Sequence, residues 1–145
     1  MEKVIIADAS GSMSENGKND VMHYVLFSIG KICDMNSLAD KPKIFVWNED
    51  ISEFTYSNPI KFYGKLNKNS LEKFFSAINP ASVLFITDGC FSSEIKKFIL
   101  DCKIRFTVLK IGCDCDTSML KAAFGSNRIF ETSDIVPCFF DFNKC

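Results

Sequence analysis

The stretch VIIADASGSM, residues 4–13, joins an apolar run to an acid and to a short loop that carries hydroxyl groups. Its four leading apolar residues are typical of a strand that is buried on both faces of a parallel sheet. Asp8 ends this run, and a carboxylate at the end of a buried strand costs free energy unless something compensates it. Two interpretations follow: Asp8, Ser10 and Ser12 bind a ligand, or their side chains cap the next helix.

Outward from this stretch, strand and helix patterns alternate along the chain. Strands are predicted at 3–8, 43–48, 52–57, 82–87, 104–111 and 128–131, and helices at 19–34, 70–78, 92–102 and 117–124. A C-terminal segment with Phe139, Phe140 and Phe142 completes the series. The short polar link before 52–57 favours a hairpin, which makes that strand an antiparallel edge. This order predicts an α/β fold, a doubly wound, mostly parallel, Rossmann-like sheet of about six strands with helices on both faces.

Size and charge restrict the classes of protein that this chain can be. Its 145 residues, 47% of them hydrophobic and 24% charged, predict one compact domain, 1–145. A net charge of −1 argues against a general basic surface for nucleic acid or anionic lipid. No apolar run reaches the roughly 20 residues of a membrane span or resembles a secretory signal. We therefore expect a cytoplasmic protein, and the sequence does not specify its oligomeric state.

Seven cysteines are spread over the chain: Cys33, Cys90, Cys102, Cys113, Cys115, Cys138 and Cys145. Their odd number and the lack of a signal segment favour reduced thiols, several of them acting as small core residues. Cys113 and Cys115 do not have the spacing of zinc ligands, and the only histidine is His23. A structural zinc site is therefore not expected.

Two acids that are far apart in the sequence are expected at one edge of the sheet. In doubly wound sheets, ligands bind beyond the carboxyl ends of the strands where the strand order reverses. The predicted strands 3–8 and 82–87 flank that point, and they are closed by Asp8 and by Thr87-Asp88-Gly89. Two carboxylates ~4 Å apart repel by roughly 4 kcal/mol at an effective dielectric near 20, and a divalent cation removes that cost. Carboxylate and hydroxyl oxygens suit Mg²⁺ or Mn²⁺.

The sequences DASGSM and LFITDG, each at the end of an apolar strand, resemble the two most recognisable parts of a von Willebrand factor type A domain. Because bacterial stand-alone relatives carry the SGSM form, the resemblance implies a bacterial-type stand-alone domain. The family's metal-ion-dependent adhesion site uses an Asp-x-Ser-x-Ser loop, a threonine on a second loop and an aspartate after the fourth strand. The resemblance implies that Asp8, Ser10, Ser12 and Asp88 hold a divalent cation, the serines directly and the aspartates directly or through water.

The second loop departs from the family's pattern. Around Gly64-Lys65-Leu66-Asn67, where the family commonly has Gly-Gly-Thr, Leu66 occupies the place of the threonine. Asn67, Asn69 or Ser70 could substitute for it, and no spacing rule selects one of them. This departure implies a weaker cation site or one that binds no metal.

Three functions from different classes are compatible with these residues. The first is a non-catalytic, divalent-metal-dependent module that binds an acidic side chain of a protein partner. The second is a scaffold of the same fold whose site has lost its metal and which interacts through another surface. The third is a phosphatase of the haloacid dehalogenase type, which needs an acid two residues after its nucleophilic aspartate. That position is Ser10 in this chain, so the sequence favours binding over catalysis.

Overall fold

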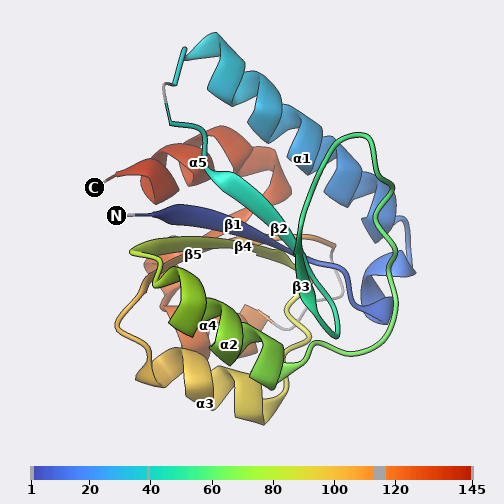
Figure 1. Cartoon of the computed structure of the whole chain (residues 1–145), viewed down its shortest axis with the longest axis vertical. Coiled ribbons are helices and arrows are strands. Elements are labelled where there is room, and N and C mark those ends of the chain that lie inside the picture. The colour runs from blue at the N-terminus through green and yellow to red at the C-terminus, as the bar shows by residue number, and fades with distance from the viewer. Residues whose placement is uncertain (1, 39, 113–116, 145) are drawn as a thin grey trace.

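The computed structural model describes residues 2–38, 40–112 and 117–144, and its central element is a six-stranded sheet (Figure 1). The strand order is β3-β2-β1-β4-β5-β6. The strands are β1 (Lys3–Asp8), β2 (Lys43–Trp47), β3 (Ile51–Glu53), β4 (Ser82–Thr87), β5 (Arg105–Lys110) and β6 (Ile129–Glu131). Only the β2–β3 pairing is antiparallel among these strands, so the predicted parallel sheet with one antiparallel edge is confirmed.

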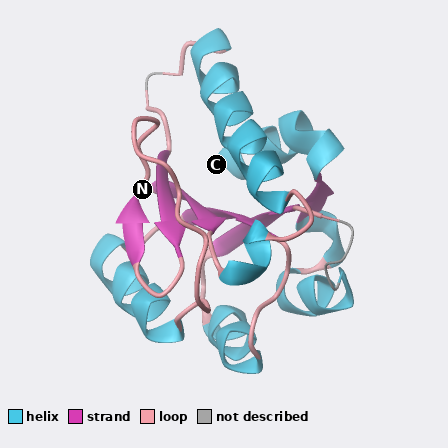
Figure 2. Ribbon diagram, turned by 90° about the vertical axis from the view of Figure 1, so that its right-hand side faces the viewer, coloured by secondary structure: helices cyan, strands magenta, loops and turns pink. Residues whose placement is uncertain are grey.

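Helices cover both faces of the sheet, as the doubly wound order requires (Figures 1 and 2). The helices are α1 (Lys18–Met35), α2 (Lys68–Ile78), α3 (Ser93–Asp101), α4 (Thr117–Phe124) and α5 (Ile135–Asn143). In Figure 1, α1 and α5 lie on one face and α2, α3 and α4 on the other. Within the described residues, no helix has both the length and the apolar character that a membrane span requires.

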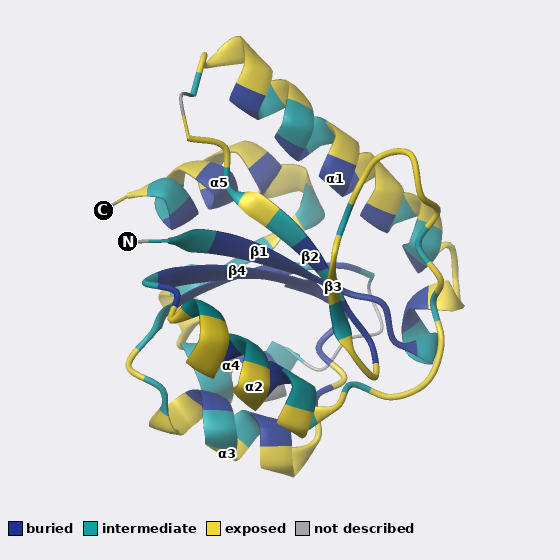
Figure 3. Ribbon diagram, in the orientation of Figure 1, coloured by how far each residue is buried: buried dark blue, intermediate teal, exposed yellow. Residues whose placement is uncertain are grey.

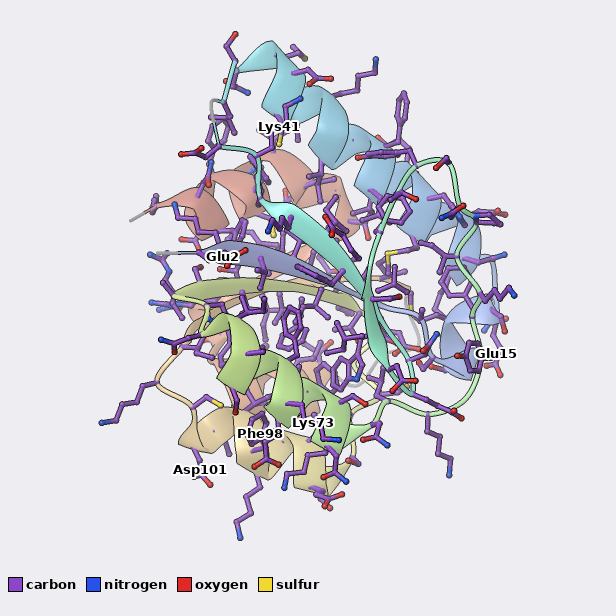
Figure 4. All side chains as sticks on the ribbon, viewed as in Figure 1. Glu2, Glu15, Lys41, Lys73, Phe98 and Asp101 are labelled. Atoms are coloured by element: carbon purple, nitrogen blue, oxygen red, sulfur yellow. The ribbon has the colours of Figure 1, made fainter. Side chains whose placement is uncertain are left out.

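The side chains of the central strand β1 point alternately to the two faces of the sheet, where they belong to two separate cores. In β1, Ile5 faces the core beneath α1 and α5, and Ile6 faces the opposite core, with both side chains fully buried. The central strands β1 and β4 are accordingly buried on both sides, while the edge strand β3 and the outer faces of the helices are more exposed (Figure 3). Side chains fill the space between the layers, and Lys73 and Asp101 lie on the outside of the helical layer (Figure 4).

The edge strand is shorter than the sequence predicts. The alternation in 52–57 indicates a strand of that length, but β3 covers only Ile51–Glu53. Beyond it, Phe54 and Tyr56 pack edge to face, with ring centroids 5.0 Å apart, and the Tyr56 hydroxyl donates to the Leu26 carbonyl of α1 at 3.0 Å. The alternation of Phe54 and Tyr56 thus reflects contacts between the two rings and between the Tyr56 hydroxyl and α1, beyond the end of the strand.

The start of the first helix also differs from its prediction. The sequence predicts a helix over 19–34, whereas α1 begins at Lys18. Its N-cap is Gly17, which has φ 75° and no side chain with which to cap. The glycine is needed because L side chains rarely adopt this left-handed conformation.

The described cysteines are free thiols, and they differ in burial. Cys33 and Cys138 are buried in the core beneath α1 and α5, as expected for small core residues. Cys90 is exposed and Cys102 is half-buried. Cys113, Cys115 and Cys145, named above in the argument about zinc, lie outside the described residues.

Candidate metal site

The carboxyl ends of β1 and β4 bring the predicted site residues together. The two strands are parallel neighbours, with Ala7 paired to Ile86, so the next residues, Asp8 and Thr87, lie side by side. The Thr87 hydroxyl donates to Asp8 Oδ2 at 2.6 Å. Asp88 follows Thr87 at the same edge and is fully buried. Because this contact joins residues 79 positions apart, it is the tertiary pairing of the strands that creates the site.

The loop after β1 folds back on the carboxylate of Asp8. Asp8 Oδ1 accepts hydrogen bonds from the backbone N–H of Ser10 at 2.9 Å and from its hydroxyl at 2.7 Å. The hydroxyl oxygens of Ser10 and Ser12 are 3.1 Å apart. This arrangement answers the question of capping, since the Ser10 side chain bonds within the loop and neither the short helix after Ser10 nor α1 has a side-chain cap.

Backbone hydrogen bonds hold this loop between its two neighbours. The N–H of Ala9 donates to the Trp47 carbonyl at 2.8 Å, and that of Gly11 donates to the Gly64 carbonyl at 2.9 Å. The Tyr63 N–H returns a bond to the Ala9 carbonyl at 3.0 Å. The loop is therefore fixed on both sides before any ligand binds, which lowers the entropic cost of arranging its side chains.

Burial makes the negative charge of Asp8 costly. Desolvation raises the pKa of the Asp8 carboxyl from its ordinary 3.8 to about 6, against the opposing effect of the hydrogen bonds from Thr87 and Ser10. The nearby charge of Asp88 makes a smaller contribution to this rise. A positive charge placed between the two carboxylates would offset this cost.

Asp88 is buried as well, but its charge is compensated. Desolvation raises its pKa, and hydrogen bonds from the Ser12 hydroxyl, the Cys90 N–H and the Lys18 ammonium outweigh that effect, so the net pKa lies below the ordinary value. Lys18 Nζ lies 3.1 Å from Asp88 Oδ2, and the Cys90 N–H lies 3.1 Å from Oδ1. The two aspartates at this edge thus have opposite pKa shifts, because desolvation dominates for Asp8, whereas the hydrogen bonds from Ser12 and Cys90 and the contact with Lys18 outweigh it for Asp88.

The donor set fits a small, hard divalent cation. In the described part of the chain, no three His, Cys, Asp or Glu side chains gather as a metal-binding group, so hydroxyl oxygens must supplement the two carboxylates. The contacts Asp8 Oδ1–Ser10 Oγ and Ser10 Oγ–Ser12 Oγ measure 2.7 and 3.1 Å. Ligands about 2.1 Å from an octahedral Mg²⁺ are about 3 Å from one another, so these spacings match.

The second loop offers an apolar side chain at the place of the expected threonine. Leu66 is half-buried and packs against the core on the α2 side of the sheet. Of the suggested substitutes, Asn67 caps α2, its side-chain oxygen accepting from the Ser70 N–H at 3.1 Å. The Ser70 hydroxyl donates to the Glu49 carbonyl. Asn67 and Ser70 are thus committed to local structure, and together with Asn69 they line a pocket separate from the one over the serines.

Replacing Asn67 by alanine tests its assignment as a capping residue. We expect the Asn67→Ala variant to unfold with about 1 kcal/mol less free energy, because the first turn of α2 loses its side-chain cap. Its response to Mn²⁺ should equal that of the wild type in thermal melts. A variant that keeps its stability but loses the Mn²⁺ response would instead make Asn67 a metal ligand.

An open pocket lies over the loop that carries the serines. Its volume is about 550 Å³, and its walls include Ser10, Ser12, Leu66, Cys90 and Phe91. Both serines of the candidate site therefore face a space that a side chain of another molecule can enter. The exposed Lys65 lies at the same pocket and adds a positive charge to its rim.

Two features of the site were missed from the sequence. Thr87 is treated there as a strand-end residue, whereas its hydroxyl bonds the Asp8 carboxylate. Lys18 is not singled out at all, although its ammonium contacts Asp88. One signal could have drawn attention to it: a lysine in the first turn of a helix opposes the macrodipole, so it needs a local compensating charge.

The fold and the site together define a Rossmann-like α/β protein with an oxygen-rich crevice at the carboxyl edge of its sheet. No known protein family matches the sequence, and no curated protein matches it either. Structural similarity is nevertheless extensive. The manganese-loaded TRAP protein of Plasmodium vivax is similar at 16% identity and a TM-score of 0.66, over 98% of this chain and 73% of that one.

Two further solved structures share the fold. An aerotolerance-related membrane protein of Bacteroides fragilis, carrying multiple mutations to serines, matches at 15% identity and a TM-score of 0.64, over 100% of both chains. Proximal thread matrix protein 1 from the mussel byssus matches at 12% identity and a TM-score of 0.61 over 97% of this chain, which spans 44% of the mussel protein. These similarities support a von Willebrand factor A-like fold, and at such identities they concern the fold alone.

Proposed function

We propose that this chain is a non-catalytic, divalent-metal-dependent protein-binding module that serves as an adaptor or scaffold. Asp8, Ser10, Ser12 and Asp88 would hold Mg²⁺ or Mn²⁺, and the partner would offer an acidic side chain to the ion. The observation that carries the proposal is the set of carboxylate and hydroxyl oxygens that tertiary pairing brings together beneath an open pocket. The similarity to a manganese-loaded protein supports the choice of ion.

Each residue of the site has a distinct role in this proposal. Ser10 and Ser12 line the pocket, and their hydroxyls would bind the ion directly. Thr87 orients the Asp8 carboxylate through its hydrogen bond to Oδ2, and the Cys90 N–H orients that of Asp88. When bound, the ion would supply the positive charge that the ionised Asp8 lacks and would attract a carboxylate of the partner.

The polar contacts of Asp8 favour binding over catalysis. Both of its carboxylate oxygens already accept hydrogen bonds, which lowers their reactivity as nucleophiles. The residue two positions later, Ser10, has no acidic group with which to protonate a leaving group. We therefore propose that the chain is not a phosphatase of the haloacid dehalogenase type.

A metal-free scaffold of the same fold is the second candidate, and two observations favour it. Leu66 occupies the position of the family's threonine, and a lysine ammonium already contacts Asp88. In this alternative, the protein would interact through another surface, and neither Mg²⁺ nor Mn²⁺ would change its stability.

A thermal melt with and without Mn²⁺ separates the two candidates. We expect Mn²⁺ to raise the melting temperature of the wild type, since a ligand at about 100 times its Kd adds about 2.7 kcal/mol to the free energy of unfolding. The Ser12→Ala variant should lose this response. The matched control is Ser14→Ala in the same turn, whose hydroxyl bonds the Gly11 carbonyl at 2.7 Å and should leave the response intact.

The results of these melts distinguish the metal-dependent module from the metal-free scaffold. No Mn²⁺ response in the wild type would favour the metal-free scaffold, and an equal loss in both serine variants would indicate a damaged loop. Binding of a partner is then tested by purification of the tagged protein in Mn²⁺ and in chelator. A partner of the proposed kind is retained by the wild type in Mn²⁺, and it is lost both in chelator and with Ser12→Ala.

A further inference from the structure

Lys18 is a lysine in an unusual environment. It is the first residue of α1, and its side chain is only 3% exposed. Lysine is almost never fully buried unless it is paired, and the positive end of a helix macrodipole disfavours a cation in the first turn. Contacts specific to this site must therefore offset both costs.

Asp88 supplies such a contact. The two side chains form an ion pair, Nζ to Oδ2, at 3.1 Å, with Asp88 fully buried. The other carboxylate oxygen of Asp88 accepts the Cys90 N–H at 3.1 Å. Asp88 also belongs to the proposed metal site, so a bound cation and the Lys18 ammonium would compete for the negative charge of the same carboxylate.

Lys18 changes the charge that a metal ion meets. Asp8 and Asp88 in their ionised forms carry two negative charges, and the ammonium of Lys18 neutralises one of them. Buried charges are screened by solvent and salt much less than surface charges, so this neutralisation acts strongly within the site. The same ammonium relieves the repulsion between the aspartates when no metal is bound.

We propose that Lys18 is a built-in counter-ion of the site, which keeps Asp88 in place without a metal ion and competes with divalent cations for that carboxylate. The inference rests on the proposed metal-dependent function, because it concerns the same carboxylate. It explains how the buried Asp88 keeps its negative charge without a metal ion. In this role, the single side chain of Lys18 lowers the affinity of the site for a metal ion.

The experiment measures Mn²⁺ affinity directly, by the loss of the electron paramagnetic resonance signal of free Mn²⁺. We expect Lys18→Met to bind Mn²⁺ at least tenfold more tightly than the wild type, because one competing positive charge is gone. Lys18→Gln is the second variant, since its amide can still donate to Asp88 without a charge and keeps the site folded. The matched control is Lys65→Met, which removes an equal charge from the rim of the same pocket.

Thermal melts in chelator and in Mn²⁺ supply the second readout. Lys18→Met should melt well below the wild type in chelator and should regain most of the difference in Mn²⁺. The inference is overturned if Lys18→Gln binds Mn²⁺ no more tightly than the wild type, or if Lys65→Met increases the affinity as much as the Lys18 variants do.

The results also separate this inference from the proposed function. If the wild type binds Mn²⁺ and the Lys18 variants bind it equally well, the function stands and the role of Lys18 is refuted. If only the Lys18 variants bind Mn²⁺, the counter-ion role stands and the wild type is the metal-free scaffold. If none of these proteins binds Mn²⁺, both proposals fail.

Discussion

The Asp8→Asn variant, measured without metal at pH 7, is expected to unfold with about 3 kcal/mol more free energy than the wild type. The expectation follows from the pKa of Asp8, which burial raises from 3.8 to about 6. At pH 7 the Asp8 carboxyl is ionised in the folded protein, although burial destabilises its charged form. Asparagine has nearly the same shape, carries no charge, and retains an oxygen that can accept from the Ser10 N–H and hydroxyl.

The advantage of the variant should depend on pH in a definite direction. A carboxyl whose pKa is raised on folding holds a proton in the native state that the unfolded state has released, so wild-type stability falls as pH rises from about 4 to about 6. Above that window the full cost of ionised Asp8 is present, and below pH 4 it disappears. Asp8→Asn and the wild type should therefore converge in stability near pH 4.

Denaturant unfolding of both proteins between pH 4 and pH 7 measures this difference. The exposed Asp50 supplies the control, since Asp50→Asn changes a surface side chain and should alter the free energy of unfolding by no more than about 0.5 kcal/mol. Asp8→Asn should also lose the response to Mn²⁺. A variant that is less stable than the wild type at pH 7 would show that the ionised carboxylate contributes more through its hydrogen bonds than it loses by burial.

The Phe85→Ala variant is expected to lose about 3–5 kcal/mol of its free energy of unfolding, the range for a buried aromatic replaced by alanine. Phe85 lies in β4, is 1% exposed, and is at the centre of an aromatic cluster. Its ring centroid lies 5.6 to 6.0 Å from four others, those of Trp47, Phe91, Phe106 and Phe124. Removing it leaves a cavity that four rigid rings cannot fill.

Thermal denaturation measures this loss as a lower melting temperature, by roughly 10–15 °C for a chain of this size. Phe140→Ala is the control, because Phe140 is 47% exposed on α5 and its removal opens no cavity between sheet and helices. Phe85→Leu should recover part of the loss by filling most of the volume. A Phe85→Ala variant that melts within a few degrees of the wild type would show that α2, α3 and α4 can close over the gap.

Much of the fold could be predicted from local pattern, for a physical reason. A strand buried on both faces must be apolar throughout, and 82–87 meets that condition in all but its ends. Helices that cover such a sheet need one apolar stripe, which α2 shows in the buried Leu71 and Phe75. The predicted strand 52–57 is too long, since the alternation of Phe54 and Tyr56 reflects contacts between their rings and with α1, which the sequence pattern does not distinguish from strand pairing.

The sequence by itself determined the composition of the candidate site. Asp8, Ser10 and Ser12 are neighbours along the chain, and their hydrogen bonds arise within one loop. The position of Asp88 also followed, because parallel strands place their carboxyl ends at one edge. The spacing of residues within one loop and the direction of the strands were sufficient to predict that these four residues lie close together.

Only the tertiary structure decided the electrostatics of that site. The ion pair of Lys18 with Asp88 joins residues 70 positions apart, and no local pattern encodes it. The same holds for the bond from Thr87 to Asp8, and for the burial that raises the pKa of one aspartate while the other is compensated. Burial and charge pairing depend on which segments meet in space. The oxygens of the candidate site can therefore be predicted from the sequence, whereas packing determines the pKa values of its carboxyl groups.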